Sequence, residues 1–100
     1  MAAALLLEAD GHGVTLFERF EAPRPVGSGL MIQPTGLAVL DSLGLGQALR
    51  ATGAPVRRLF GRAGADGPVV LDVRYAAGGP RAGVGYGVHR AALFDICIRR

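Results

Sequence analysis

An acidic residue, Glu18, closes Val14–Glu18, a short run of β-branched and aromatic residues that predicts a strand. A carboxylate at the end of the second strand of a βαβ unit can accept hydrogen bonds from both hydroxyls of a ribose. The alternative interpretation is a solvated glutamate at a strand end, since the chain contains no G-x-G-x-x-G fingerprint. Glu18 is therefore the first candidate for binding a nucleotide.

Arginine is the second residue type whose chemistry could matter. All 11 basic residues of the chain are arginines, and the formal net charge is +3. They are scattered rather than gathered with aromatic residues, which argues against nucleic-acid binding. A single guanidinium can still hold a phosphate through two hydrogen bonds. Arg90 stands at the start of a predicted helix, where it could flank a diphosphate, although a surface ion pair is the alternative.

Other reactive side chains give weaker signals. His12 and His89 have no second ligand at zinc spacing, so no metal site is expected. Cys97, the only cysteine, excludes a disulfide scaffold and is interpreted as a small core residue. No catalytic acid–base pair and no elbow nucleophile stands out, so no catalytic residue is assigned.

The composition indicates one small globular domain of 100 residues, with 50% hydrophobic and 19% charged residues. No apolar stretch reaches the ~18–20 residues of a membrane span. The apolar start lacks the basic region of a secretory signal. We therefore expect no membrane association and a cytoplasmic location.

The first elements indicate an α/β fold. The residues Ala2–Asp10 favour a helix that ends at Gly11, and the strand Val14–Glu18 follows. A helix that leads into a strand through a short turn is the second half of a βαβ unit. The first strand of that unit, its parallel partner, is missing.

The rest of the chain alternates between further elements. The pattern predicts a hairpin with an Asp66-Gly67 turn and a final strand and helix. In chain order the predicted segments are a loop over Glu21–Gly29, an extended piece at Leu30–Gln33, helices at Thr35–Leu43 and Leu45–Thr52, strands at Val56–Arg62 and Val69–Tyr75, a loop at Ala76–Gly83, a strand at Val84–His89 and a helix at Arg90–Ile98.

Four segments in series resemble the FAD-dependent aromatic hydroxylases, the flavoprotein monooxygenases built like para-hydroxybenzoate hydroxylase. The segments are GHGVTLFER from Gly11, RPVGSGL from Arg24, QPTGLAVL from Gln33 with the following LGL, and VHRAAL from Val88. The last is similar to the h-R-x-x-L element of that family. The resemblance covers nearly the whole chain in the expected order.

The resemblance implies roles for five residues. Glu18 would bind the adenosine ribose of FAD, and Arg19 would lie along the adenine and ribose. Arg24 and the loop to Gly29 would pass near the flavin, and Arg90 would contact the pyrophosphate or the ribityl chain. The activity implied is hydroxylation of an organic, aromatic substrate with NAD(P)H and O₂, in which the flavin supplies the chemistry.

The resemblance also implies an incomplete domain. We expect residues 1–100 to form part of a Rossmann-like FAD-binding domain, with residues 55–75 as a β-hairpin that reaches toward a substrate domain. The N-terminal G-x-G-x-x-G strand and the C-terminal part of the family are absent, which suggests an inactive fragment. The alternatives are a non-oxygenase FAD-dependent oxidoreductase, a non-catalytic truncated remnant and a small helical interaction module.

Overall fold

Two antiparallel sheets form the framework of the chain, and the larger has the strand order β1-β5-β2. This computed structural model describes residues 1–22, 24, 26–75 and 83–99. The strands of the larger sheet are β1 (Gly29–Ile32), β2 (Ala54–Val56) and β5 (Gly85–His89). Because the central strand β5 comes late in the chain, both of its pairings join residues that are distant in sequence.

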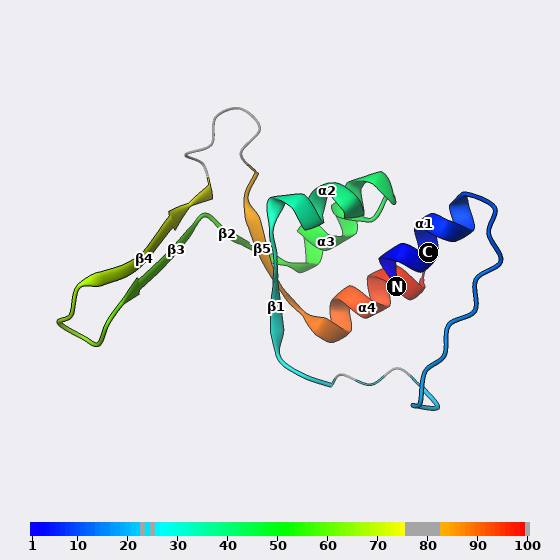
Figure 1. Cartoon of the computed structure of the whole chain (residues 1–100), viewed down its shortest axis with the longest axis horizontal. Helices are drawn as coiled ribbons and strands as arrows, with labels where there is room; N and C mark the ends of the chain where they lie inside the picture. The colour runs from blue at the N-terminus through cyan, green and yellow to red at the C-terminus, as the bar shows by residue number, and fades with distance from the viewer. Residues whose placement is uncertain (23, 25, 76–82, 100) are drawn as a thin grey trace.

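Four helices, α1 (Ala2–Ala9), α2 (Pro34–Ser42), α3 (Gly46–Thr52) and α4 (Arg90–Ile98), lie on one side of this sheet (Figure 1). Pro34 occupies the first turn of α2, where its missing N–H group costs no hydrogen bond. Gly44 follows α2 with a φ of +73°, the left-handed conformation in which helices commonly end. The tight α2–α3 connection therefore follows from local sequence.

The core lies between these helices and β5. Leu49 is the one fully buried side chain of the described residues, with 0% exposure. Burial also raises the pKa of the Cys97 thiol, which fits its role as a small apolar core residue. The buried apolar residues are Leu37, Leu40, Leu43, Leu45, Leu49, Val88 and Cys97.

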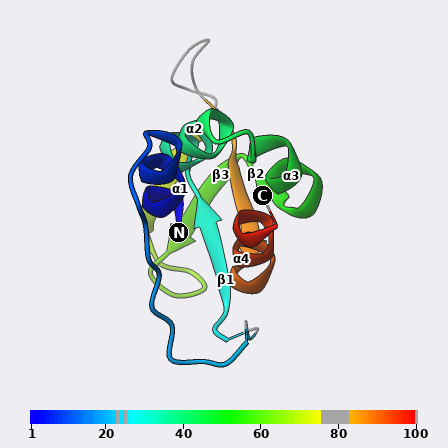
Figure 2. The same ribbon diagram turned by 90° about the vertical axis from the view of Figure 1, so that its right-hand side faces the viewer.

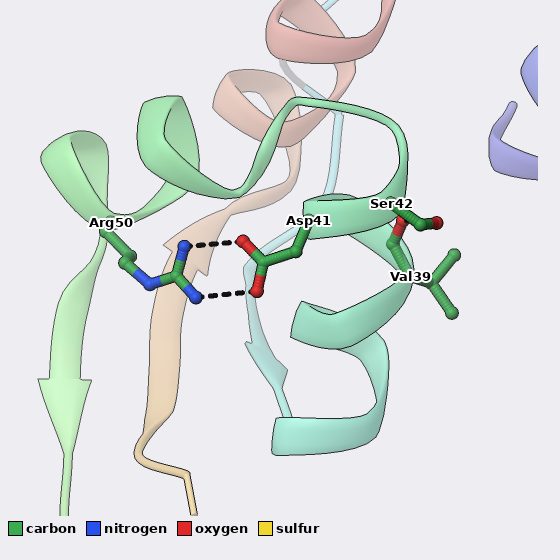
Figure 3. Close-up of polar contacts among 4 residues, drawn as sticks. All are labelled: Val39, Asp41, Ser42 and Arg50. Atoms are coloured by element: carbon green, nitrogen blue, oxygen red, sulfur yellow. Dashed lines mark hydrogen bonds and ion pairs between the residues drawn. The ribbon is translucent and has the colours of Figure 1, made fainter.

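An ion pair joins α2 to α3 on the outside of the core. Arg50 donates two hydrogen bonds to the Asp41 carboxylate, at 2.6 and 2.7 Å, and these bonds lower the pKa of Asp41 (Figure 3). A Cβ at Gly46 would overlap the Asp41 carboxylate. A glycine at the start of α3 thus leaves room for this pair.

The second sheet is the hairpin of β3 (Arg58–Arg62) and β4 (Val69–Arg74), which projects away from the helices (Figure 1). All residues of β4 are exposed. The projection gives the chain a radius of gyration of 16.5 Å, against about 13 Å for a compact domain of 100 residues. The predicted hairpin is thus present, but it contributes nothing to the buried core.

The predicted strand Val14–Glu18 is wrong. These residues follow α1 as an extended, exposed segment with no ladder partner in the described chain, and Phe17 is 94% exposed. The segment runs along the outside of the body (Figure 2). A strand exists only where a neighbour accepts its backbone hydrogen bonds, so β propensity alone does not create one.

The α/β class is confirmed, whereas the Rossmann-like arrangement is not seen. Every strand pair of the described residues is antiparallel, so they contain no βαβ unit. The predicted strand Val56–Arg62 is also wrong as one element, because it breaks at Arg57 into β2 and β3, which belong to different sheets. The predicted helices and the remaining strands are confirmed within one or two residues, and most of the predicted loop Ala76–Gly83 lies outside the described residues.

Candidate functional site

A cleft of about 380 Å³ lies between the irregular segment that follows α1 and one face of α4, from its first residue to its last. Three of the residues singled out from the sequence, Glu18, Arg24 and Arg90, line it together. Glu18 and Arg24 are near each other in the sequence, and both precede Arg90 by more than 60 positions. The cleft is also lined by Phe20, Glu21, Ala22, Val26, Ala91, Phe94 and Ile98.

The Glu18 carboxylate is held by the backbone that follows it. Its Oε1 accepts hydrogen bonds from the N–H groups of Arg19, at 2.7 Å, and Phe20, at 3.2 Å. These two bonds fix the orientation of the carboxylate at the turn where the chain enters the cleft. Among the described residues no donor bonds Oε2, so this oxygen can accept a hydrogen bond from a ligand.

Arginine side chains surround the Phe20 ring. The guanidinium carbon of Arg19 lies 5.0 Å from the centre of the ring, and that of Arg24 lies 5.5 Å from it. Both distances are within the reach of a cation–π contact. Arg24 thus lines the cleft while its guanidinium rests on Phe20, whereas Arg19 contacts the same ring without lining the cleft.

Arg90 begins α4, and the β1–β5 ladder determines where it lies. Gly29 pairs with His89 at the end of this antiparallel ladder. The next position along β1 toward the N-terminus, Ser28, therefore comes level with Arg90. The predicted residue Gly29 thus lies beside the cleft as part of the strand that anchors the loop from Arg24.

Sequence reasoning missed the apolar part of the cleft wall. Phe94 and Ile98 follow Arg90 at steps of four residues on α4, the spacing that places side chains on one face of a helix. This periodicity could have identified both residues once Arg90 was chosen. Glu21, a second carboxylate in the cleft, has no such signal, because an irregular segment carries it.

An apolar cavity of about 390 Å³ lies on the other side of Arg90, between α1, α2 and α4. It is lined by Met1, Ala2, Ile32, Gly36, Val39, Leu40, Leu93, Phe94 and Cys97 as well as by Arg90. Arg90 and Phe94 therefore line both the cleft that contains the charged residues and the apolar cavity. Among the described residues no group of three His, Cys, Asp or Glu side chains is placed to hold a metal ion.

Two further findings on the described residues concern the helices and Cys97. None of the helices placed by the structure has both the length and the apolar character that crossing a membrane requires. Cys97 is a free, buried thiol.

Comparison with known proteins identifies the class. The chain is 42% identical over 60 residues to phenazine 1,6-dicarboxylic acid hydroxylase of Lysobacter antibioticus. The aligned residues make up 59% of this chain and 15% of that protein. The chain is also 42% identical over 69 residues to 3-amino-4-hydroxybenzoate 2-monooxygenase of Streptomyces cremeus, over 67% of this chain and 17% of the relative. FAD-dependent urate hydroxylase of Klebsiella pneumoniae is 29% identical over 59 residues, which are 59% of this chain and 15% of that enzyme. No family model matches the chain.

The resemblance predicted from the sequence is thereby confirmed, and the chain is related to the FAD-dependent aromatic hydroxylases and monooxygenases. It spans about a sixth of the length of the curated relatives it matches.

Proposed function

We propose that this chain forms part of the FAD-binding region of a flavin-dependent monooxygenase, which hydroxylates an aromatic substrate with NAD(P)H and O₂ in the cytoplasm. The observation that carries the proposal is the meeting of Glu18, Arg24 and Arg90 in one cleft. The relatives add the chemistry, because their names describe hydroxylation or mono-oxygenation of aromatic compounds.

The residues of the cleft fit parts of FAD. The guanidinium groups of Arg24 and Arg90 are donors that match a diphosphate, and the free oxygen of Glu18 is an acceptor that matches a ribose hydroxyl. The volume of about 380 Å³ falls within the range of about 300–1,000 Å³ typical of ligand sites. When FAD is bound, it supplies the redox chemistry, and these residues bind and orient it.

The Rossmann-like arrangement also belongs to this proposal. The exposed apolar side chains of Val14, Leu16 and Phe17 lie on an extended segment that could pair as a strand if a neighbouring strand were present. A parallel strand laid against this segment would convert α1 and residues 14–18 into the second half of a βαβ unit. Residues 1–100 would then belong to the FAD-binding domain, and the hairpin of β3 and β4 would extend from this domain toward a substrate domain.

We expect this chain alone to bind FAD weakly, so that the purified protein is colourless. The sequence has no G-x-G-x-x-G turn, whose backbone N–H groups neutralise a pyrophosphate at a helix N-terminus. A yellow preparation that contains one FAD per chain would contradict both this expectation and the interpretation of the chain as an incomplete FAD-binding domain.

A chimera tests the proposed function. This chain replaces the matched segment of 3-amino-4-hydroxybenzoate 2-monooxygenase, and FAD binding is measured by the change in flavin fluorescence. Retention of FAD would support the proposal. A folded chimera that no longer binds FAD would overturn it.

The Glu18→Gln variant of the chimera tests the role of Glu18. Glutamine keeps one acceptor oxygen but loses the charge, and charge-assisted hydrogen bonds contribute about 1.5–3 kcal/mol each. We therefore expect FAD to bind about ten- to a hundredfold more weakly. Glu8→Gln, on the exposed surface of α1, is the matched control and should leave the dissociation constant unchanged. Glu21→Gln distinguishes the two carboxylates of the cleft, and a larger effect there would reassign the ribose contact to Glu21.

A further inference from the structure

We infer that Gly27 is a positioning residue that sets the direction of the Arg90 guanidinium in the cleft. The relevance of this positioning to FAD binding rests on the proposed function. The position of Gly27 beside Arg90 is observed in the described residues and does not depend on that function. Gly27 does not line the cleft and makes no contact of its own with a ligand in it.

The Arg90 side chain lies on the side of Gly27 where any other residue would carry its Cβ. A Cβ built on Gly27 would lie 3.5 Å from both Cζ and Nε of Arg90, and 3.6 Å from its Cδ. The guanidinium and the end of its stem therefore pass close to Gly27, at the distance where a methyl group on this residue would just touch them. The β1–β5 ladder produces this approach, because its last pair, Gly29 with His89, brings the preceding loop over the start of α4.

Within the described part of the chain, no group of opposite charge holds Arg90. Among the described residues, no carboxylate lies within ion-pair distance of its guanidinium, whereas Arg50 and Arg58 each have an aspartate partner. Arg90 is exposed and borders two cavities, the cleft with Glu18 and Arg24 and the apolar cavity. The loop backbone at Gly27 is thus a fixed surface against which this long, mobile side chain can rest.

The backbone conformation of Gly27 makes this close approach specific to glycine. Its φ of +94° is favourable for glycine and strained for residues that carry a Cβ. An alanine at this position favours a negative φ, which would redirect the loop and remove the surface beneath Arg90. The added methyl group itself would only make an ordinary contact at 3.5 Å, so strain rather than collision is the expected cause.

The chain contains a matched control. Gly44 also has a positive φ, +73°, but nothing lies within 4 Å of a Cβ built there. Gly44→Ala introduces the same kind of backbone strain without approaching Arg90. A difference between Gly27→Ala and Gly44→Ala therefore reports the close approach to Arg90 rather than the general cost of replacing a left-handed glycine.

Side-chain NMR of the full chain tests the inference directly. Arginine labelled with ¹⁵N gives an Nε–H signal for each ordered side chain, and Arg90→Lys identifies the signal of Arg90. We expect this signal to move toward the position of solvated arginines in Gly27→Ala and to stay in place in Gly44→Ala. An unchanged signal in Gly27→Ala, or an equal shift in both variants, would overturn the inference.

Two further measurements keep the outcome clear. The backbone amide signals of β5 report whether each variant folds; if Gly27→Ala does not, Gly27→Asn replaces it, because asparagine tolerates a positive φ better than alanine. The same variants are then made in the chimera with 3-amino-4-hydroxybenzoate 2-monooxygenase, and we expect about tenfold weaker FAD binding for Gly27→Ala than for the unchanged chimera or Gly44→Ala. A shifted Arg90 signal together with equal FAD binding by all the chimeras would leave the positioning role intact and overturn the proposed function. FAD binding that is equal in all variants, together with an Arg90 signal that does not move, would overturn the positioning role and leave the proposed function intact.

Discussion

The two sheets of this chain differ in local sequence and in surroundings, and the burial of their strands follows the surroundings. β5 carries glycines at alternate positions, which are poor strand formers, yet it is the best buried strand of the molecule. β4 consists mostly of valine and leucine, which favour strands, yet all six of its residues are exposed. The difference lies in the neighbours, since β5 has a strand on each side and helices over it, whereas β4 has only β3.

This comparison also separates two kinds of stability. The body of β1, β2, β5 and the helices contains every buried apolar residue of the described chain, so its free energy of unfolding rests on the hydrophobic effect. The hairpin rests on its ladder, on the Arg58–Asp72 pair at 2.7 Å and on the contacts of Arg58 and Arg62 with the Phe60 ring. A hairpin with two open faces is marginal in water, so the hairpin is expected to open independently of the body.

The largest expected effect is at the centre of the body. Leu49→Ala removes a fully buried side chain, and we expect it to lower the free energy of opening by about 2–5 kcal/mol. Hydrogen exchange at the amides of α3 and β5 measures this change even if thermal unfolding of the chain is broad, as we expect for a chain with so much exposed apolar surface. Val70→Ala on β4, where the side chain is 66% exposed, is the control and should change the opening free energy by less than about 0.5 kcal/mol. Equal effects of the two variants would remove the distinction between body and hairpin.

A smaller effect is expected at the turn of the hairpin. A Cβ at Gly67 would overlap the backbone carbonyl of Ala63, so Gly67→Ala forces the turn to rearrange. We expect the hairpin to be destabilised by about 1–3 kcal/mol, as in overpacked sites, while α3 and β5 are unaffected. The amide of Ala63, bonded to the carbonyl of Pro68 at 3.0 Å, should exchange faster. Faster exchange at β5 in the same variant would indicate that hairpin and body unfold together.

Gly64→Ala provides the comparison for that substitution. Gly64 has a φ of +81° in the same turn, but no atom lies within 4 Å of a Cβ built there. Only backbone strain is then added, and a smaller effect on Ala63 exchange is expected than in Gly67→Ala. A larger effect in Gly64→Ala would show that strain rather than overlap controls this turn.

The smallest expected effect is that of acid, and it should be shared by body and hairpin. Hydrogen bonds from Arg50 and Arg58 lower the pKa of Asp41 and Asp72, respectively, below their usual value of 3.8. Because the folded pKa lies below the unfolded one, each pair stabilises the fold fully above pH 3.8 and loses this contribution as the pH falls through the folded pKa. Both pairs are exposed, so the loss should be small. An NMR titration of the two carboxyl groups between about pH 6 and 2 checks the direction, and a pKa above 3.8 at either aspartate would contradict it.

Local sequence predicted much of the fold. The Pro34 start and Gly44 end of α2, the α4 helix and the Asp66-Gly67 connection between β3 and β4 follow from residue preferences that act over a few positions. The two errors concern residues 14–18 and the break at Arg57. In both, the local preference for extended backbone was correct, but the existence or continuity of a strand depended on partners far along the chain.

For the candidate site, too, one part could be predicted from the sequence and another part could not. Its charged residues could be selected from the sequence: Glu18 and Arg90 through their chemistry and the resemblance to the FAD-dependent aromatic hydroxylases, and Arg24 through that resemblance alone. Their meeting in one cleft could not, nor could the close approach of Arg90 to Gly27. Both depend on the antiparallel pairing of β1 with β5, which joins residues about 60 positions apart. The sequence alone thus determined the chemistry that this chain carries, whereas long-range strand pairing decided where that chemistry is brought together, since such pairing is selected by packing of the whole chain rather than by any local preference.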